Sequence, residues 1–102
     1  MCTEKNSIIQ GKTLELLEMT IKRMDNQLLL SWEVETNGSI VHIVFYNVSR
    51  FKMENVSAPI EIHGFRITDH SQNGWESNSR YEVGDYEDDC IHFFCEHFEM
   101  TD

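Results

Sequence analysis

Proline, cysteine and long apolar runs are scarce in this sequence, and each scarcity excludes a class of protein. A single proline among 102 residues, together with 40% hydrophobic and 11% aromatic content, argues against a disordered chain. Three cysteines are an odd number and too few to staple a secreted fold, so we expect reduced thiols. No apolar run reaches the length of a membrane span, about 18 residues, and "MCTEKNSIIQGK" lacks the features of a signal peptide. We therefore expect a cytoplasmic protein that has no membrane partner.

The length of the chain predicts a single domain. A chain of 102 residues can bury one core but is too short for two, so the expected domain is 1–102. Within it, the polar residues 1–12 are expected to form a loosely ordered lead-in, and residues 13–100 carry the pattern of a folded core.

Basic residues are also scarce, and their scarcity is uneven along the chain. The sequence has 8 Lys and Arg against 18 Asp and Glu, a net charge of −10. Residues 1–80 hold ten acids and all eight bases (8 − 10 = −2), whereas residues 81–102 hold eight acids and no Lys or Arg (−8). Binding to nucleic acid requires basic residues that replace phosphate counterions, so we expect no direct nucleic-acid partner. A basic protein partner fits better, and the alternative is that the carboxylates only keep the protein soluble.

Alternating apolar residues and tight turns predict an all-β fold. The run "QLLLSWEVE" alternates as a half-buried strand, and Asn37-Gly38 is a strong signal for a hairpin leading into "SIVHIVFYNV". Residues Thr13 to Met24 fit a helix as well as a strand, although the turn signal Asp25-Asn26 that follows favours a hairpin. Six to eight strands at this spacing predict an antiparallel β-sandwich or a partly open barrel.

The second half of the chain contains a change of strand parity around a glycine. In "PIEIHGFRITD", Ile60 and Ile62 share one parity while Phe65 and Ile67 share the other. A β-bulge at Gly64 would reconcile the two within one strand, and this is the predicted structure. The acidic turn "GDYEDD" is then expected to separate the last strands.

Cysteine and histidine near the end of the chain raise the question of a metal or catalytic site. Cys90, His92, Cys95 and His97 offer ligand types that zinc prefers, but in an extended strand the first two and the last two project to opposite faces. A Cys90–His92 nucleophile pair is also disfavoured, because the three acids before it raise the thiol pKa. The sequence has no other catalytic or phosphate-binding motif, so we expect no metal, no cofactor, no catalytic residue and no enzymatic activity.

The candidate functional residues are those that could contact a protein partner. The acidic segment supplies Asp85, Glu87, Asp88 and Asp89, with Tyr86 as an aromatic contact. Trp75 follows a glycine in a polar loop, where it either packs back onto the sheet or serves as a second aromatic anchor.

Four stretches of the sequence resemble a known group of proteins. The runs "LLLSWEVETNGSIVHIVFYNVSRF", "APIEIHGFRITDHSQNGW", "RYEVGDYEDD" and "IHFFCEHFEM" are similar to small acidic bacterial β proteins associated with polymorphic toxin loci, which are treated as immunity proteins or left uncharacterised. The resemblance covers about residues 13–100. The residues that carry it are Phe45, Tyr46, Asn47, Val48, Gly64, Trp75, Tyr81, Asp85, Glu87, Phe93 and Cys95.

This resemblance implies a non-enzymatic immunity protein that binds and inhibits a cognate toxin. Many toxin domains of this kind are basic nucleases, which agrees with the acidic composition. The alternative is a small structural or accessory β domain that self-associates as a homo-oligomer through a sheet edge or an apolar face. The two hypotheses differ in whether a long secreted toxin is encoded beside the gene.

Overall fold

The computed structural model describes residues 13–54, 59–70, 80–85 and 90–101, and these residues form nine β-strands. The strands are β1 (Leu14–Met24), β2 (Gln27–Thr36), β3 (Ser39–Tyr46), β4 (Ser49–Met53), β5 (Ile60–Ile62), β6 (Phe65–Asp69), β7 (Tyr81–Asp85), β8 (Ile91–Cys95) and β9 (His97–Thr101). The described residues include no helix, and therefore none long and apolar enough to cross a membrane.

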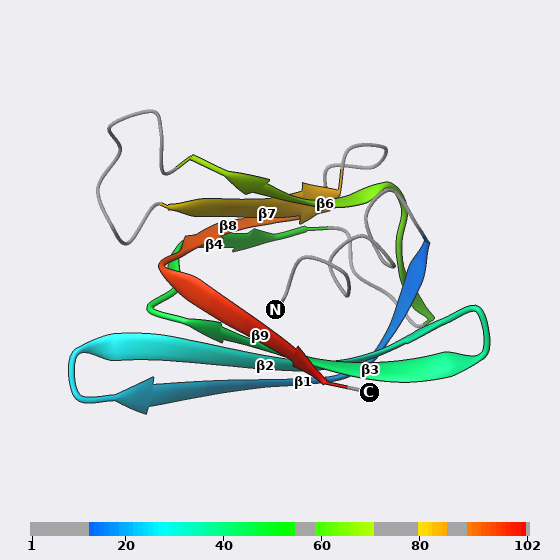
Figure 1. Ribbon diagram of the computed structural model, residues 1–102, viewed down its shortest axis with the longest axis horizontal. Helices are drawn as coiled ribbons and strands as arrows, with labels where there is room; N and C mark the ends of the chain where they lie inside the picture. Colours follow the sequence, from blue (N-terminus) through cyan, green and yellow to red (C-terminus); the bar gives the residue numbers. More distant parts are fainter. Residues whose placement is uncertain (1–12, 55–58, 71–79, 86–89, 102) are drawn as a thin grey trace.

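The strands form two antiparallel sheets that pack face to face as a sandwich (Figure 1). Sheet A has the order β5-β1-β2-β3-β9, and sheet B has the order β4-β8-β7-β6. The all-β prediction is confirmed, and of the two predicted architectures the sandwich is the one observed, because the sheets do not close into a barrel. The nine strands exceed the predicted six to eight. Residues 60–69 divide into β5 of sheet A and β6 of sheet B, and residues 91–101 divide into β8 of sheet B and β9 of sheet A.

Two long hairpins build most of sheet A. Residues Thr13 to Met24, which fitted helix or strand from sequence alone, contain strand β1, which pairs along β2 through the predicted turn at Asp25-Asn26. The second turn has positive φ at both Asn37 (53°) and Gly38 (77°), the conformation that Asn-Gly predicts. Both hairpins extend beyond the ends of sheet B (Figure 1).

The predicted bulge at Gly64 is wrong. Ile60 and Ile62 belong to β5 in sheet A, whereas Phe65 and Ile67 belong to β6 in sheet B. Gly64, with φ of 67°, lies where the chain crosses between the sheets. Both pairs of residues face the shared core, and the change of sheet therefore causes the change of parity.

Two further crossings lie side by side and hold the sheets together. The chain leaves sheet A at Asn47 and returns to it at Glu96. The Asn47 side-chain amide donates a hydrogen bond to the Glu96 carboxylate (3.1 Å), and the Glu96 backbone N–H donates to the Tyr46 carbonyl (3.0 Å). These bonds connect segments 49 residues apart in the sequence.

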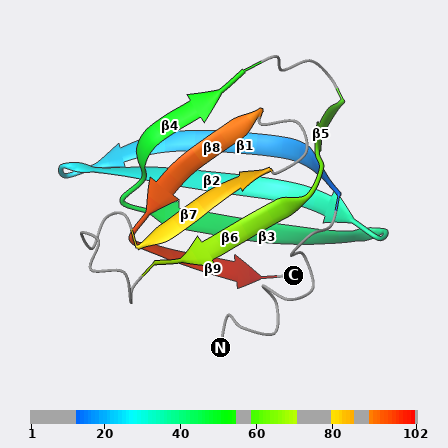
Figure 2. The same ribbon diagram turned by 90° about the horizontal axis from the view of Figure 1, so that it is seen from above.

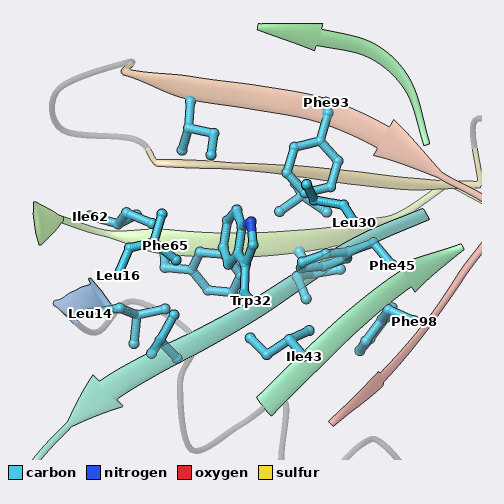
Figure 3. Close-up of a cluster of buried hydrophobic side chains, with 14 of the residues drawn as sticks. Leu14, Leu16, Leu30, Trp32, Ile43, Phe45, Ile62, Phe65, Phe93 and Phe98 are labelled. Atoms are coloured by element: carbon cyan, nitrogen blue, oxygen red, sulfur yellow. The ribbon is translucent and has the colours of Figure 1, made fainter. Parts of the chain in front are cut away.

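Aromatic side chains from both sheets meet at the centre of the core, as Figure 3 shows around Trp32. The Trp32 ring lies 5.0 Å from Phe45 of its own sheet, and 5.9 Å and 5.7 Å from Phe65 and Phe93 of sheet B, between ring centroids. Such edge and tilted contacts add to the free energy gained by burying large rings. The Trp32 side chain is therefore a main link between the two sheets.

Candidate functional site

Of the residues predicted to contact a partner, Asp85 is the one that the structure describes, and it is buried. It ends β7 with an exposed fraction of 5%. Its Oδ1 accepts hydrogen bonds from the backbone N–H groups of Cys90 (2.9 Å) and Ile91 (3.3 Å), which begin the return of the chain into β8. In this position the carboxylate holds the ends of two strands together and presents little charge to solvent.

The remaining predicted contacts lie outside the described residues. They are Trp75, Tyr86, Glu87, Asp88 and Asp89, which fall in the ranges 71–79 and 86–89. Their assignment to partner binding stays a prediction.

The cysteine and histidine residues near the end of the chain are separated by the fold. Cys95 is fully buried in the core, and burial raises the pKa of its thiol to about 12. His97 begins β9 on the other sheet, whereas His92 lies on the outer face of sheet B. Within the described part of the chain, no group of three Cys, His, Asp or Glu side chains is placed to hold a metal ion.

Glutamates gather on the outer face of sheet A. No described element covers this face (Figure 1). The registers of the strands place three of them in one row across the sheet, Glu61 opposite Glu15 and Glu15 opposite Glu35. A second row contains Glu18 opposite Glu33. We call this surface the acidic face, and its six members are Glu15, Glu18, Glu33, Glu35, Glu61 and Glu99.

In the described part of the chain, no Lys or Arg forms an ion pair with a glutamate of the acidic face. Among the described residues its ion-pair contacts are all to histidines, at 4.0 Å (Glu33–His42), 3.7 Å (Glu61–His63) and 3.8 Å (Glu99–His97), and these are charged only when protonated. Glu99 also accepts a hydrogen bond from the Tyr46 hydroxyl (2.8 Å), which together with partial burial and the negative charge of Glu99 raises the Tyr46 pKa. Like charges directly opposite on neighbouring strands destabilise a sheet, so this arrangement costs stability.

The outer face of sheet B has the opposite character. A row across it runs from Arg66 past Gly84 and His92 to Lys52. The Arg50 guanidinium lies beside this row, 5.4 Å above the ring of Phe94. The described residues therefore give the two outer faces of the sandwich charges of opposite sign. Negative charge is found on sheet A as well as in the acidic end of the sequence.

A His–Glu–His network lies on the outer face of sheet B. Glu82 accepts hydrogen bonds from Nε2 of His92 (2.7 Å) and from Nε2 of His70 (2.8 Å). Gly84 makes room for the His92 ring, because a Cβ at Gly84 would lie 3.3 Å from the imidazole and 3.2 Å from the Ile91 carbonyl oxygen. The His92 bond is the main cause that lowers the Glu82 pKa, against the opposing effect of burial.

Replacing Glu82 by glutamine is expected to lower the free energy of unfolding by about 1 kcal/mol at neutral pH, because the network then lacks its carboxylate acceptor. A lowered carboxylate pKa stabilises the fold above the unfolded pKa, about 4.3 for glutamate, and this contribution disappears as the pH falls through the folded value. The difference between wild type and variant, measured by urea denaturation, should therefore vanish in acid. Glu54→Gln is the matched control, and a pH-independent difference would contradict the assignment.

Sequence reasoning missed the acidic face, although part of its signal was visible. The alternation in β2 places Glu33 and Glu35 on one face. Glu15 lies on β1, whose hairpin with β2 the turn signal favoured, but Glu61 and Glu99 come from strands that join sheet A only through the tertiary fold. The bulge between Leu16 and Glu18 also changes the parity of β1, so the second row could not be read from alternation alone.

Comparison with protein families finds a match over most of the chain. A family model described as "Immunity protein PIM8" matches residues 9–101 of the chain. No curated protein and no solved structure matches the chain. The matched range includes every strand of the sandwich and every residue of the acidic face.

Proposed function

The chain belongs to the immunity protein PIM8 family, and from this premise we propose that it neutralises a toxin protein by binding it through the acidic face. Binding is sufficient for this role, and we propose that the protein acts without catalysis. The partner is expected to present a basic surface.

The uncompensated rows of glutamates carry this proposal. Glu15 stands between Glu61 and Glu35 on neighbouring strands, an arrangement that lowers the stability of the free protein. Lys or Arg side chains of a partner would replace this repulsion with attraction. An open sheet face also lets one rigid partner surface reach all the rows at once (Figure 1).

Complementary charge acts mainly on the rate of association. Opposite potentials steer two proteins together and can raise the association rate constant far above that of a neutral pair. Exposed charges are screened beyond about 10 Å at 0.1 M salt, so the rate should fall as salt is added. Rapid capture suits an inhibitor that must bind its toxin before the toxin acts.

Removing three charges from the acidic face is expected to slow toxin binding. The variant carries Glu15→Gln, Glu35→Gln and Glu61→Gln, and its association rate constant with the cognate toxin domain should fall about tenfold at low salt. Stopped-flow mixing at several salt concentrations measures this rate. The same substitutions relieve like-charge repulsion, so the free energy of unfolding should stay the same or rise.

A second variant with Glu87→Gln, Asp88→Asn and Asp89→Asn removes the same charge from the acidic turn that the sequence singled out. If this variant alone slows association, the acidic face is not the binding surface and the sequence-based prediction is confirmed. If neither variant changes the rate while the complex still forms, charge does not direct binding and the proposal fails.

A further inference from the structure

Most of one side of β1 has no described strand beside it. In sheet A, β1 lies between β5 and β2, but β5 pairs only with Leu14 to Leu16. Residues 17–24 therefore form an open edge within the described structure, with backbone N–H and C=O groups available to another strand. Figure 2 shows this edge running out to the β1–β2 turn. Open edges of this length are sites at which proteins pair.

The side chains along the open edge are amphipathic. The register with β2 places Glu18, Thr20 and Lys22 on the outer face of the sheet, and Met19 and Ile21 on the inner face. Ile21 is 51% exposed although it faces inward, because the hairpin extends beyond sheet B. A strand added to this edge would cover both apolar side chains.

This edge carries two opposite charges, Glu18 and Lys22. Glu18 stands opposite Glu33 of β2, and Lys22 stands opposite Leu29. Within the described part of the chain, neither makes an ion pair. They are four residues apart in an extended strand, about 13 Å, too far to pair with each other. A strand running the other way with the same sequence would satisfy both.

We propose that a second copy of the chain binds this edge, with the two β1 strands antiparallel and Thr20 on the two-fold axis. Glu18 of each copy then lies opposite Lys22 of the other, and Met19 lies opposite Ile21. Opposite charges and apolar pairs placed directly across neighbouring strands stabilise a sheet. A two-fold axis makes each of these contacts twice, which is the usual symmetry of a homodimer.

This register is selected over its neighbours. A shift that places Ile21 on the axis sets Glu18 opposite Met24 and Lys22 opposite Thr20, so both ion pairs are lost. A register shifted by one residue would place outer-face side chains of one β1 strand opposite inner-face side chains of the other. Thr20 is also the middle residue of 17–23. With Thr20 on the axis, residues 17–23 of the two copies pair with each other, and the pairing stops before residues 14–16, which already pair with β5.

The dimer joins two five-stranded sheets into one continuous sheet through their edges. Of the acidic face, Glu18 alone gains a partner in the dimer, and the other five glutamates keep their surroundings. The inference does not rest on toxin binding, and it can be tested on the protein alone. Sedimentation velocity of the full chain over a range of concentrations should show a reversible monomer–dimer equilibrium.

Charge exchange tests the register. Glu18→Lys or Lys22→Glu alone creates two like-charge pairs across the axis and should raise the dimer dissociation constant about tenfold or more. An equimolar mixture of the two variants should form a heterodimer, because every pair then has opposite charges. The double variant with both substitutions should dimerise like the wild type.

Lys52→Glu is the control, because it makes the same charge change on sheet B, away from the β1 edge, and it should leave the monomer–dimer equilibrium unchanged. Circular dichroism checks that each variant is folded. A wild-type protein that is monomeric at every concentration would overturn the proposal. A dimer that neither single substitution weakens would overturn it as well. If the chain is monomeric, self-association is rejected; weaker toxin binding by Lys22→Glu, which lies outside the six residues of the acidic face, would then assign the open edge to the toxin interface.

Discussion

Replacing Trp32 by alanine is expected to lower the free energy of unfolding by about 3–5 kcal/mol, a large part of the stability of a typical domain. Trp32 is 1% exposed and contacts Phe45, Phe65 and Phe93, so its removal leaves a cavity between the sheets. Urea denaturation followed by far-ultraviolet circular dichroism measures the loss, because the signal does not depend on the replaced indole.

Trp32→Phe is the matched control. The indole Nε1 is buried without a hydrogen-bond partner among the described residues, so phenylalanine removes no hydrogen bond seen there and leaves a smaller cavity. The cost should be clearly smaller than that of alanine. Equal stability of the wild type and the alanine variant would show that the two sheets are not held together through this side chain.

Replacing Asp85 by alanine is expected to lower the free energy of unfolding by about 2–4 kcal/mol. The substitution leaves the backbone N–H groups of Cys90 and Ile91 without their acceptor, and the Ile91 N–H lies in a buried position. Desolvated donors without a partner carry the full cost of their burial. Thermal and urea denaturation should both report the loss.

Asp85→Asn keeps a carbonyl oxygen in the same place and should cost less than Asp85→Ala. Because of this structural role, Asp85 is left unchanged in the variants that test the acidic turn, so that slower binding is not confused with a weakened fold. If Asp85→Ala is as stable as the wild type but slows toxin association, then its carboxylate contacts the partner as the sequence predicted.

The acidic segment illustrates why charge composition locates a site only coarsely. The concentration of −8 in residues 81–102 indicated a negative surface near the end of the chain. The fold buries Asp85, places Glu82 between two histidines, and puts Glu99 on sheet A beside β3. Glutamates from both halves of the sequence meet on the acidic face, since strand pairing brings together residues that composition counts separately.

The sequence by itself determined the local structure and the class of protein. The alternation in β2 and β3 follows from neighbouring residues, because successive side chains of a strand project to opposite faces. The Asn37-Gly38 turn is also local, because it requires positive φ at two adjacent residues, which Asn and Gly tolerate. The family match over residues 9–101 likewise agrees with the resemblance seen in the sequence.

Only the tertiary structure decided which sheet each strand joins and what lies opposite each side chain. The parity change around Gly64 was predicted to be a bulge, but it marks a crossing between the sheets, and another crossing lies at Glu96. The acidic face depends on the bulge in β1 and on β5 and β9, which are distant in sequence from the strands they pair with, and the open edge of β1 depends on the short length of β5. Register follows from how apolar faces pack against each other across the whole core, and no single stretch of sequence contains that information.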